Sequence, residues 1–568
     1  MKQKSKKHFW IYASLLALVF LCLSAHGGTM LNNNDNGAGS LHYGMANATT
    51  DKSHPDKDHD HDHDCPTTGV TNFWALGGNA GTKAGSNFLG TTDNQPLELK
   101  VNGQRALRFE PNTNGAPNIL GGSPANRVGP NPNAVGVTIA GGGAMSVSPF
   151  DELFQGDFAN VADSYFATIG GGFANKIQMN TPTNATSNRA IAATIAGGYS
   201  NTIAGQFAAI GGGSGNTVTA NGGSAAIAGG YGNSVSGGAS TIAGGTRNNM
   251  AGTLSSIGGG SANTVEFNSY SATIAGGSQN LIQTNAQAAT IGGGQGNTIQ
   301  SGPESNFAST IAGGGYNSIA TGANYSSIGG GAQNSIQRYG GYSGDYSTIA
   351  GGSGNSVQAG AIGSAIGGGY GNTSTGPLSA IPGGDQNIAN TSSFAAGHRA
   401  KASHTGAFVW ADATDADVSS AADNQFTARA SGGVVFYSTP DLSSGVSLAP
   451  GGGSWASLSD RNAKEHLQSV DGRAVLEKLC ALPLATWNYK TQAKSIRHLG
   501  PMAQDFHAAF QIGEDDKHIT TIDEDGVALA AIQGLNDKLN EKVMEIQQLK
   551  QRLEKLEQLV NEKNGDGK

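Results

Sequence analysis

Charged and aromatic side chains are scarce in this sequence. Of its 568 residues, 13% are charged and 7% are aromatic, whereas 88 residues are glycine. This composition is poor material for one large globular core and favours a stacked, fibrous architecture. The formal net charge is -8, so the chain also lacks the basic footprint of a nucleic-acid-binding protein, and we expect no nucleic-acid partner.

Cysteine is nearly absent as well. One of the three cysteines, Cys22, lies in an apolar N-terminal run, without the small residues that a lipoprotein signal places just before its cysteine. Cys65 and Cys480 are far apart in the sequence and form no disulfide framework. Stability must therefore come from assembly rather than from crosslinks.

The N-terminus has the features of a secretory signal. Four lysines among the first seven residues precede an apolar run over residues 9–23, and small residues follow it. The run is shorter than the ~20 residues that a membrane-spanning helix needs. We therefore predict a signal peptide over residues 1–27 and a secreted or cell-surface protein. The alternative is an N-terminal membrane anchor.

Residues 28–66 lack hydrophobic periodicity and predict a disordered linker. Within them, residues 58–64 alternate aspartate with histidine, a pattern that could chelate a divalent metal. Flexible ligands lose ordering entropy on binding, so we favour a solvated tether. The sequence predicts neither a metal site nor a cofactor.

A small β module is predicted over residues 67–134. Hydrophobic alternation at 97–101 and 106–109, joined by Asn102-Gly103, predicts a β-hairpin. Trp74 and Phe88 are expected to be core or trimer-interface residues rather than residues that stack on a ligand.

A thirteen-fold repeat dominates residues 135–412. Its unit is Ile-x-Gly-Gly-x-x-Asn-x-(Ile/Val), and each starting isoleucine has an asparagine six positions later. The starting residues are Ile169, Ile195, Ile210, Ile227, Ile242, Ile257, Ile274, Ile291, Ile311, Ile328, Ile349, Ile366 and Ile381. The unit is too short for two helices, and β-branched residues between glycine turns predict one coil of a β-solenoid.

Each part of the repeat has an expected role in the coil. The isoleucine and the apolar residue eight positions later should point inward, and Gly-Gly should form the turn between them. The asparagine should bond turn backbone or stack with its equivalents in adjacent coils. A coil buries one or two aliphatic side chains against an ordering cost of ~1 to 2 kcal/mol per residue, so stacking and trimerisation must supply the remaining stability.

Over about residues 169–410 the repeats resemble the left-handed β-roll heads of trimeric autotransporter adhesins, although their spacing is longer and less regular. The resemblance implies a trimeric fibre. After it, His398 and His404 have no carboxylate partner at suitable spacing, so we expect structural roles for both. Residues 413–454 are predicted to form a β neck and a linker.

Two motifs near the C-terminus, Ser459-Asp460-Arg461-x-x-Lys464 and the sequence HLGPMAQ at residues 498–504, resemble the intramolecular chaperone of phage endosialidases and tail fibres. The resemblance implies an α+β chaperone and autopeptidase domain over residues 455–530. It also places Ser459 and Lys464 on the two positions of the family's Ser-Lys dyad, and it implies structural roles for His498 and Gln504.

The proposed chemistry constrains the local geometry. A serine hydroxyl is a weak nucleophile and needs a base, which a lysine can be if burial lowers its pKa. Five residues apart, the two would face different sides of a helix. Ser459 should therefore precede the helix, with Asp460 as its N-cap and Lys464 folded back. Cleavage is expected at Leu458–Ser459 or at Ser459–Asp460.

The rest of the C-terminal region predicts helices. One helix is expected over about residues 473–482, a strand around 486–489 and a second helix from near Pro501. The closing segment, residues 531–562, has the heptad pattern of a coiled coil, which is compatible with three strands. Its a positions are Ile532, Leu539, Ile546, Leu553 and Val560, and its d positions are Leu535, Lys542, Leu549 and Leu556.

These features together predict a mainly β protein, a trimeric β-solenoid or β-roll fibre with a C-terminal α+β chaperone domain and a coiled coil. We expect a secreted homotrimeric fibre or adhesin-like surface protein that cleaves itself once, and whose receptor could be a cell surface or a glycan. One alternative is a non-cleaving trimerisation domain on a structural fibre. The other is a glycan-degrading enzyme, which isolated acids such as Asp345 and Asp385 disfavour.

Overall fold

The computed structural model describes residues 74–112, 114–131, 134–145, 158–179, 190–302, 305–338 and 344–565. The predicted signal segment, the His/Asp tract, Cys22 and Cys65 lie outside these residues. Among the described helices, none combines the length and the apolar character that a membrane span requires. The chain divides into two compact units, residues 1–88 and residues 89–568.

The described end of the first unit brings two aromatic residues together. Trp74 Nε1 donates a hydrogen bond to the backbone oxygen of Phe88 at 3.1 Å. The exposed fractions of the two residues are 50% and 52%. Neither is a core residue within one chain, which corrects one of their two predicted roles. Their place at a trimer interface stays a prediction.

The second unit begins with the predicted hairpin. Strands β1 (Leu97–Val101) and β2 (Gln104–Glu110) pair antiparallel, and the turn residues Asn102 and Gly103 have φ values of 48° and 71°. Strand β2 pairs antiparallel with β3 (Asn118–Gly121), which then pairs in parallel with the first solenoid strand. Coil stacking therefore starts before residue 135, where the sequence placed its boundary.

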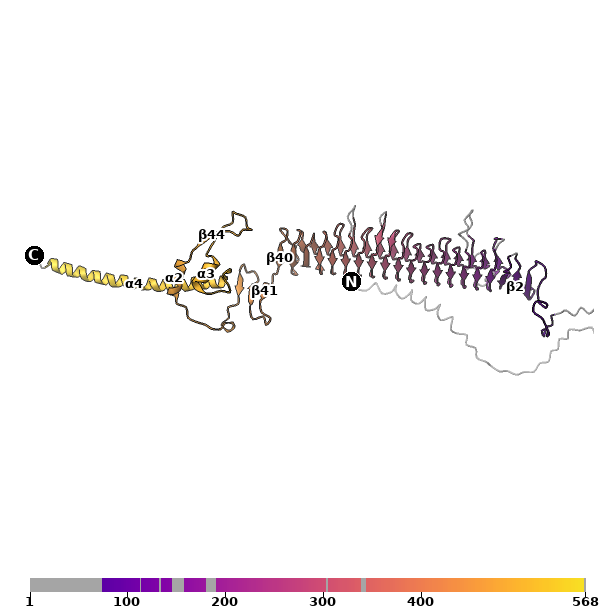
Figure 1. Ribbon diagram of the computed structural model, residues 1–568, viewed down its shortest axis with the longest axis horizontal. Helices are drawn as coiled ribbons and strands as arrows, with labels where there is room; N and C mark the ends of the chain where they lie inside the picture. Colours follow the sequence, from indigo (N-terminus) through magenta and orange to yellow (C-terminus); the bar gives the residue numbers. More distant parts are fainter. Residues whose placement is uncertain are drawn as a thin grey trace, which may run out of the picture. The chain divides into compact units, whose positions relative to one another are not determined.

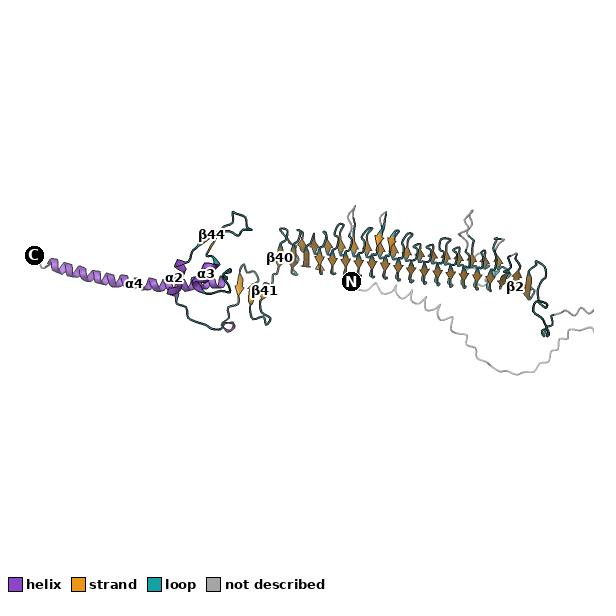
Figure 2. Cartoon of the chain, in the orientation of Figure 1, coloured by secondary structure: helices purple, strands orange, loops and turns teal. Residues whose placement is uncertain are grey.

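The solenoid is built from two ladders of short parallel strands, which Figures 1 and 2 show as two rows of arrows. The first ladder contains β5 (Thr138–Ile139), β7 (Thr168–Ile169), β9 (Thr194–Ile195), β11 (Ala209–Ile210), β13 (Ala226–Ile227), β15 (Thr241–Ile242), β17 (Ser256–Ile257), β19 (Thr273–Ile274), β22 (Thr290–Ile291), β25 (Thr310–Ile311), β27 (Ser327–Ile328), β29 (Thr348–Ile349), β31 (Ala365–Ile366), β33 (Ala380–Ile381), β36 (Phe394–His398), β38 (Phe408–Ala411) and β40 (Phe426–Arg429).

The second ladder contains β4 (Arg127–Val128), β6 (Val161–Ala162), β8 (Lys176–Ile177), β10 (Thr202–Ile203), β12 (Thr217–Val218), β14 (Ser234–Val235), β16 (Asn249–Met250), β18 (Thr264–Val265), β20 (Leu281–Ile282), β23 (Thr298–Ile299), β26 (Ser318–Ile319), β28 (Ser335–Ile336), β30 (Ser356–Val357), β32 (Thr373–Ser374), β35 (Ile388–Ala389), β37 (Ala400–Ala402) and β39 (Val418–Ser419). Each interior strand pairs with one strand before it and one after it. Among the described strands, the end strand β4 pairs with β6 alone and the end strand β39 pairs with β37 alone, so the ladder is open.

Side chains between the two ladders form the solenoid core. Ile195 and Ile203, eight residues apart in one coil, are both fully buried, and the other starting isoleucines are buried to the same degree. The outward neighbours on the strands, such as Thr194, are partly or fully exposed. The inward orientation predicted from the repeat is confirmed.

The Gly-Gly turn requires its second glycine. Gly198 has a φ of 93°, in the left-handed region. A Cβ at this position would collide with the backbone oxygen of Gly213 in the next coil. Both the backbone conformation and the close approach of the coils therefore exclude a side chain here.

The asparagine of each coil makes both of the predicted interactions. Asn201 Nδ2 donates to the backbone oxygen of Gly197 in its own turn and to that of Gly213 in the next coil, each at 3.1 Å. Asn201 Oδ1 accepts hydrogen bonds from the backbone N–H and from Nδ2 of Asn216, at 3.0 and 3.1 Å. The asparagines are fully buried and satisfied.

These contacts repeat along the fibre and form what we call the asparagine ladder. It starts where Asn160 donates to Asn126 and ends where Asn387 Oδ1 accepts the backbone N–H of Ala400 at 2.9 Å. Its members are Asn126, Asn160, Asn175, Asn201, Asn216, Asn233, Asn248, Asn263, Asn280, Asn297, Asn317, Asn334, Asn355, Asn372 and Asn387.

Among the thirteen repeats from Ile169 onwards, variation in coil length falls in one turn, which we call the variable turn. It runs from the inward residue of a second-ladder strand to the next starting isoleucine. It spans seven positions from Ile203 to Ile210 and nine from Val218 to Ile227. The spacing from the isoleucine to the inward residue stays at eight. In two such turns a further parallel pair forms, β21 (Ala286–Gln287) with β24 (Asn306–Phe307).

The C-terminal end of the solenoid differs from its middle. Phe394, Phe408 and Phe426 stack on successive strands, with ring centroids 4.4 and 4.9 Å apart. Strand β40 pairs in parallel with β38, so coil stacking continues past residue 412 into the predicted neck.

His398 corrects an expectation drawn from the sequence. Its Nδ1 lies 2.8 Å from Asp385 Oδ2 and its Nε2 lies 3.3 Å from Asp415 Oδ1. It therefore has two carboxylate partners, where the sequence suggested none. Asp385, in β34 (Gly384–Asp385), pairs with His398 in the register of adjacent coils, so linear spacing hides the contact. His404 Nδ1 contacts Ser420 Oγ at 2.8 Å.

The C-terminal region combines a sheet with helices. Strands β41 (Val434–Tyr437), β42 (Gly445–Leu448) and β43 (Trp455–Ser457) form an antiparallel sheet, so β42 occupies part of the predicted linker. The elements that follow are η1 (Arg461–Ala463), α2 (Gly472–Ala481), β44 (Ala485–Trp487), β45 (His498–Gly500), α3 (Ala503–Phe510) and α4 (Thr521–Gly565). The predicted helices and strand fall at α2, β44 and α3.

A small core joins these helices. Leu482, Phe506 and Val527 are buried together. Helices α2 and α4 cross closely at Gly472 and Gly534, since neither residue has a side chain. The crossing leaves no room for a Cβ at either position. Ion pairs Arg473–Glu541 and Lys538–Glu477 flank this crossing at 2.6 and 3.1 Å.

Candidate functional site: the Ser459–Lys464 pair

Ser459 lies directly after a sheet and directly before a turn of helix. Strand β43 ends two residues before it, and the Leu458 N–H donates to the backbone oxygen of Gly445 at 3.4 Å. Asp460 is extended and is the N-cap of η1, with its side chain accepting the N–H of Asn462 at 3.0 Å. The predicted cap is present, although the helix is a single 3-10 turn.

The same short turn brings the lysine back to the serine. Lys464 is the C-cap of η1, extended with a φ of -125°, and its N–H donates to Arg461. Its Nζ donates to Ser459 Oγ at 2.7 Å. This distance lies within the ~2.6–3.2 Å at which a base can take a proton from a nucleophile. The two residues of the candidate dyad therefore meet.

The surroundings of this pair are open to solvent. Ser459 and Lys464 are exposed, and Leu458 is 50% exposed. A lysine becomes a base only when its neutral form is favoured, and desolvation is the usual cause. Among the described residues of one chain, none provides that desolvation.

The other two motif residues lie in the small β–α part of the region. His498 Nε2 lies 2.9 Å from Gln492 Oε1, and the ring packs on Trp487 with centroids 4.8 Å apart. Gln504 is exposed in the first turn of α3. These contacts connect His498 to packing and not to Ser459. In the described part of the chain, no group of three or more His, Cys, Asp or Glu side chains could hold a metal ion.

Comparison with known families identifies this region. Residues 459–511 match Peptidase_S74, the chaperone of endosialidase. The match begins at Ser459 and covers η1, α2, β44, β45 and α3. This family is one of self-cleaving intramolecular chaperones. No curated protein matches the chain.

The chain thus carries a chaperone-of-endosialidase domain at residues 459–511, behind a long β-solenoid. The predicted C-terminal chaperone domain and the predicted mainly β fold class are both confirmed.

Proposed function

We propose that the protein is a secreted, homotrimeric, adhesin-like fibre whose C-terminal domain drives assembly and then cleaves itself at or beside Ser459. The observation that carries this proposal is the Lys464–Ser459 hydrogen bond at the first residue of the matched domain. Secretion rests on the N-terminal sequence alone, and the receptor would be a cell surface or a glycan.

Helix α4 supports the trimer. The apolar a and d residues of its heptads are exposed in one chain, for example Ile532 at 62% and Leu549 at 53%. An apolar stripe of this kind demands partner helices. At the flanking positions, Glu545 and Arg552 would face Lys550 and Glu557 of a parallel neighbour, so the charges are complementary in that arrangement.

The exposed dyad supports an order of events. Lys464 needs desolvation to act as a base, and one chain leaves it in solvent. Assembly of three chains would supply the missing cover. Cleavage would then follow trimerisation, and release of the chaperone would leave a kinetically trapped fibre.

The chemistry of the step is a single acyl transfer. Neutral Lys464 takes the proton of the Ser459 hydroxyl as Oγ bonds to a backbone carbonyl carbon. The C–N bond then breaks, the leaving amine receives the proton from the Lys464 ammonium, and water hydrolyses the resulting ester to a carboxylate and free serine hydroxyl. No co-reactant other than water is needed.

The size of the ring that forms during the attack indicates which peptide bond Ser459 can cleave within its own chain. Oγ of Ser459 reaches the Leu458 carbonyl of its own chain through a five-membered ring. Attack on its own carbonyl, which would break Ser459–Asp460, would need a strained four-membered ring. We therefore expect cleavage before Ser459 if the serine acts within its own chain, and cleavage after Ser459 would require the serine of a neighbouring chain.

Intact mass spectrometry of purified protein tests the proposal. The wild type should yield a fragment spanning residues 459–568 or 460–568, and Ser459→Ala and Lys464→Ala should abolish it. Ser457→Ala and Lys490→Ala are matched controls at exposed positions outside the pair and should cleave normally. A native trimer that stays uncleaved in every sample would instead establish a permanent trimerisation domain.

A further inference from the structure

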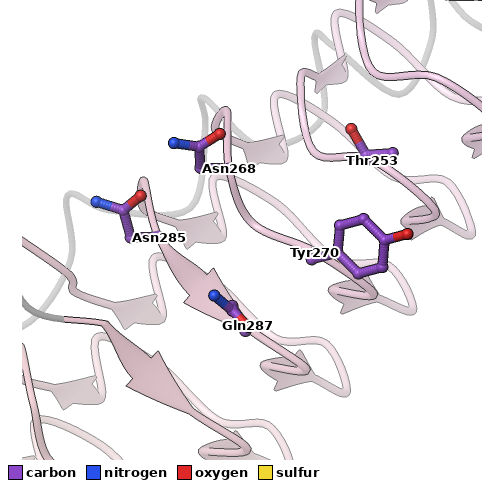
Figure 3. A pocket seen from close by; sticks show the side chains of 5 residues that line it. All are labelled: Thr253, Asn268, Tyr270, Asn285 and Gln287. Carbon is purple, nitrogen blue, oxygen red and sulfur yellow. The ribbon is translucent and has the colours of Figure 1, made fainter.

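A polar hollow of about 410 Å³ lies on the variable turns of the solenoid. Its lining residues come from successive coils and form two rows, which Figure 3 shows. The first row is Thr253, Tyr270 and Gln287, each four residues before a starting isoleucine, and the second row is Asn268 and Asn285, each six residues before one. We call this hollow the amide groove.

The side chains of the amide groove have free hydrogen-bonding capacity. Within the described part of the chain, those of Thr253, Asn268, Tyr270 and Gln287 hydrogen-bond to no other residue. Asn285 Nδ2 donates to the backbone oxygen of Gly302 at 3.1 Å, and its Oδ1 accepts no hydrogen bond from the residues that the structure describes. The buried asparagine ladder, in contrast, uses every amide to hold the coils together. Apart from the Asn285–Gly302 contact, the groove amides therefore form none of the coil-to-coil bonds that the ladder amides form, although Asn268 and Asn285 both have left-handed backbone conformations, with φ values of 55° and 65°.

The framework around the groove is held in place. Gln287 lies in β21, whose pairing with β24 adds a further strand pair to the variable turn. Beside it, the Glu266 carboxylate accepts the N–H and the hydroxyl of Thr284 at 3.0 and 2.8 Å. A ligand would therefore meet a preformed surface, on the one turn of the coil that is free to vary without disturbing the two ladders.

The chemistry of the lining selects its ligand. Three amides and two hydroxyls offer neutral donors and acceptors, and Tyr270 is 49% exposed. None of the described residues that line the groove is charged, which disfavours phosphates, acidic polymers and metal ions. Neutral hydrogen-bonding groups beside an exposed aromatic face suit hydroxyl-rich rings, whose apolar faces pack on the aromatic ring.

The spacing of the rows suits a linear ligand. Neighbouring coils are about 4.8 Å apart, so the three residues of the first row span about 10 Å along the fibre axis. We propose that the amide groove binds a short segment of an uncharged glycan. The inference rests on the proposed adhesin role and gives that role a ligand class and a place on the fibre.

Saturation-transfer NMR with the full chain tests the groove. The neutral probes are maltohexaose, mannohexaose, cellohexaose and chitohexaose, and the acidic probe is hexagalacturonate. At least one neutral probe should show transfer, and hexagalacturonate should show none. Tyr270→Ala should weaken the neutral interaction at least tenfold by titration, and Asn268→Ala should weaken it several-fold.

Tyr370→Ala is the matched control, since Tyr370 is an exposed tyrosine at the opposite turn of its coil. It should bind like the wild type. Absence of transfer from every neutral probe would overturn the inference, as would binding that survives Tyr270→Ala or is lost in Tyr370→Ala. The molecular mass and the extent of cleavage are measured on the same samples. They show whether a loss of glycan binding comes from the groove itself or from failed assembly.

Discussion

At the scale of single residues, the asparagine ladder determines how the coils hold together. Asn248 lies in the middle of the repeats and donates from Nδ2 to Gly244 and Gly260 at 3.0 and 3.1 Å. Its Oδ1 accepts the N–H of Asn263 at 3.0 Å. A buried group that loses its partner costs about 1–3 kcal/mol, so one side chain here supports several backbone groups.

We expect Asn248→Ala to destabilise the fibre by about 3 kcal/mol or more, since it leaves backbone groups unpaired in two neighbouring turns. Asn249→Ala is the control, because Asn249 is the adjacent exposed residue on β16. Guanidine unfolding and hydrogen exchange measure the difference. Equal behaviour of the two variants would show that the ladder does not carry this stability.

His398 gives the solenoid end a pH dependence. The hydrogen bond to Asp385 raises the pKa of His398, burial opposes the rise, and Asp415 adds to it. Protonated histidine is therefore favoured in the folded state. Its stabilisation is fully present below the unfolded pKa of about 6.5 and is lost as pH rises through the raised folded pKa.

Stability of the solenoid end should therefore fall in the wild type as pH rises above about 6.5. His398→Gln should remove this step, and His404→Gln, which changes a histidine paired with a serine, should keep it. Hydrogen exchange at β36 and β38 across this pH range reads the local stability. A step that persists in His398→Gln would refute the assignment.

At the scale of elements, the crossing of α2 and α4 depends on two glycines. A Cβ at Gly534 would collide with the backbone oxygen of Gly472, whereas a Cβ at Gly526, in the same helix, would meet nothing within 4 Å. The two positions therefore separate packing from helix propensity.

Gly534→Ala should destabilise the chaperone region by about 1–3 kcal/mol through overpacking. Gly526→Ala should stabilise it by up to about 1 kcal/mol, because alanine favours a helix more than glycine does. The two variants are compared in a Ser459→Ala background by thermal unfolding, which is monitored through the helical signal. Two variants that shift the midpoint in the same direction would contradict this account.

Much of each element could be predicted from the sequence. The buried isoleucines, the Gly-Gly turn and both asparagine contacts follow from one repeat unit, because each is fixed within a coil or between neighbours in register. The Asp385–His398 contact and the amide groove could not be predicted. They depend on which residues of different coils the register and the variable turns bring together.

The dyad is an intermediate case. The five-residue spacing correctly placed Asp460 as a cap and Lys464 beside Ser459, since a single turn decides both. The burial that the chemistry needs could not be read from that spacing, because it depends on contacts outside the segment. The roles of both residues in cleavage stay a prediction.

At the scale of the whole molecule, the exposed dyad and the exposed heptad residues lead to the prediction that cleavage requires assembly. Leu549→Asp places a charge at a d position and should prevent the coiled coil. We expect this variant to be monomeric and uncleaved. Gln548→Asp, an adjacent exposed change, should remain trimeric and cleave. Light scattering gives the mass and a denaturing gel gives the cleavage, and a cleaved monomer would refute the order of events.

The asparagine ladder also has a consequence for the size of the fibre. The contact from one asparagine to the next is nearly the same whether 15, 17, 20 or 21 residues separate the two. The length of the ladder therefore depends on the number of stacked coils and not on the number of residues in each coil. The solenoid thus acts as a molecular ruler. The number of repeat copies sets its length, and surface loops can be enlarged without changing that length.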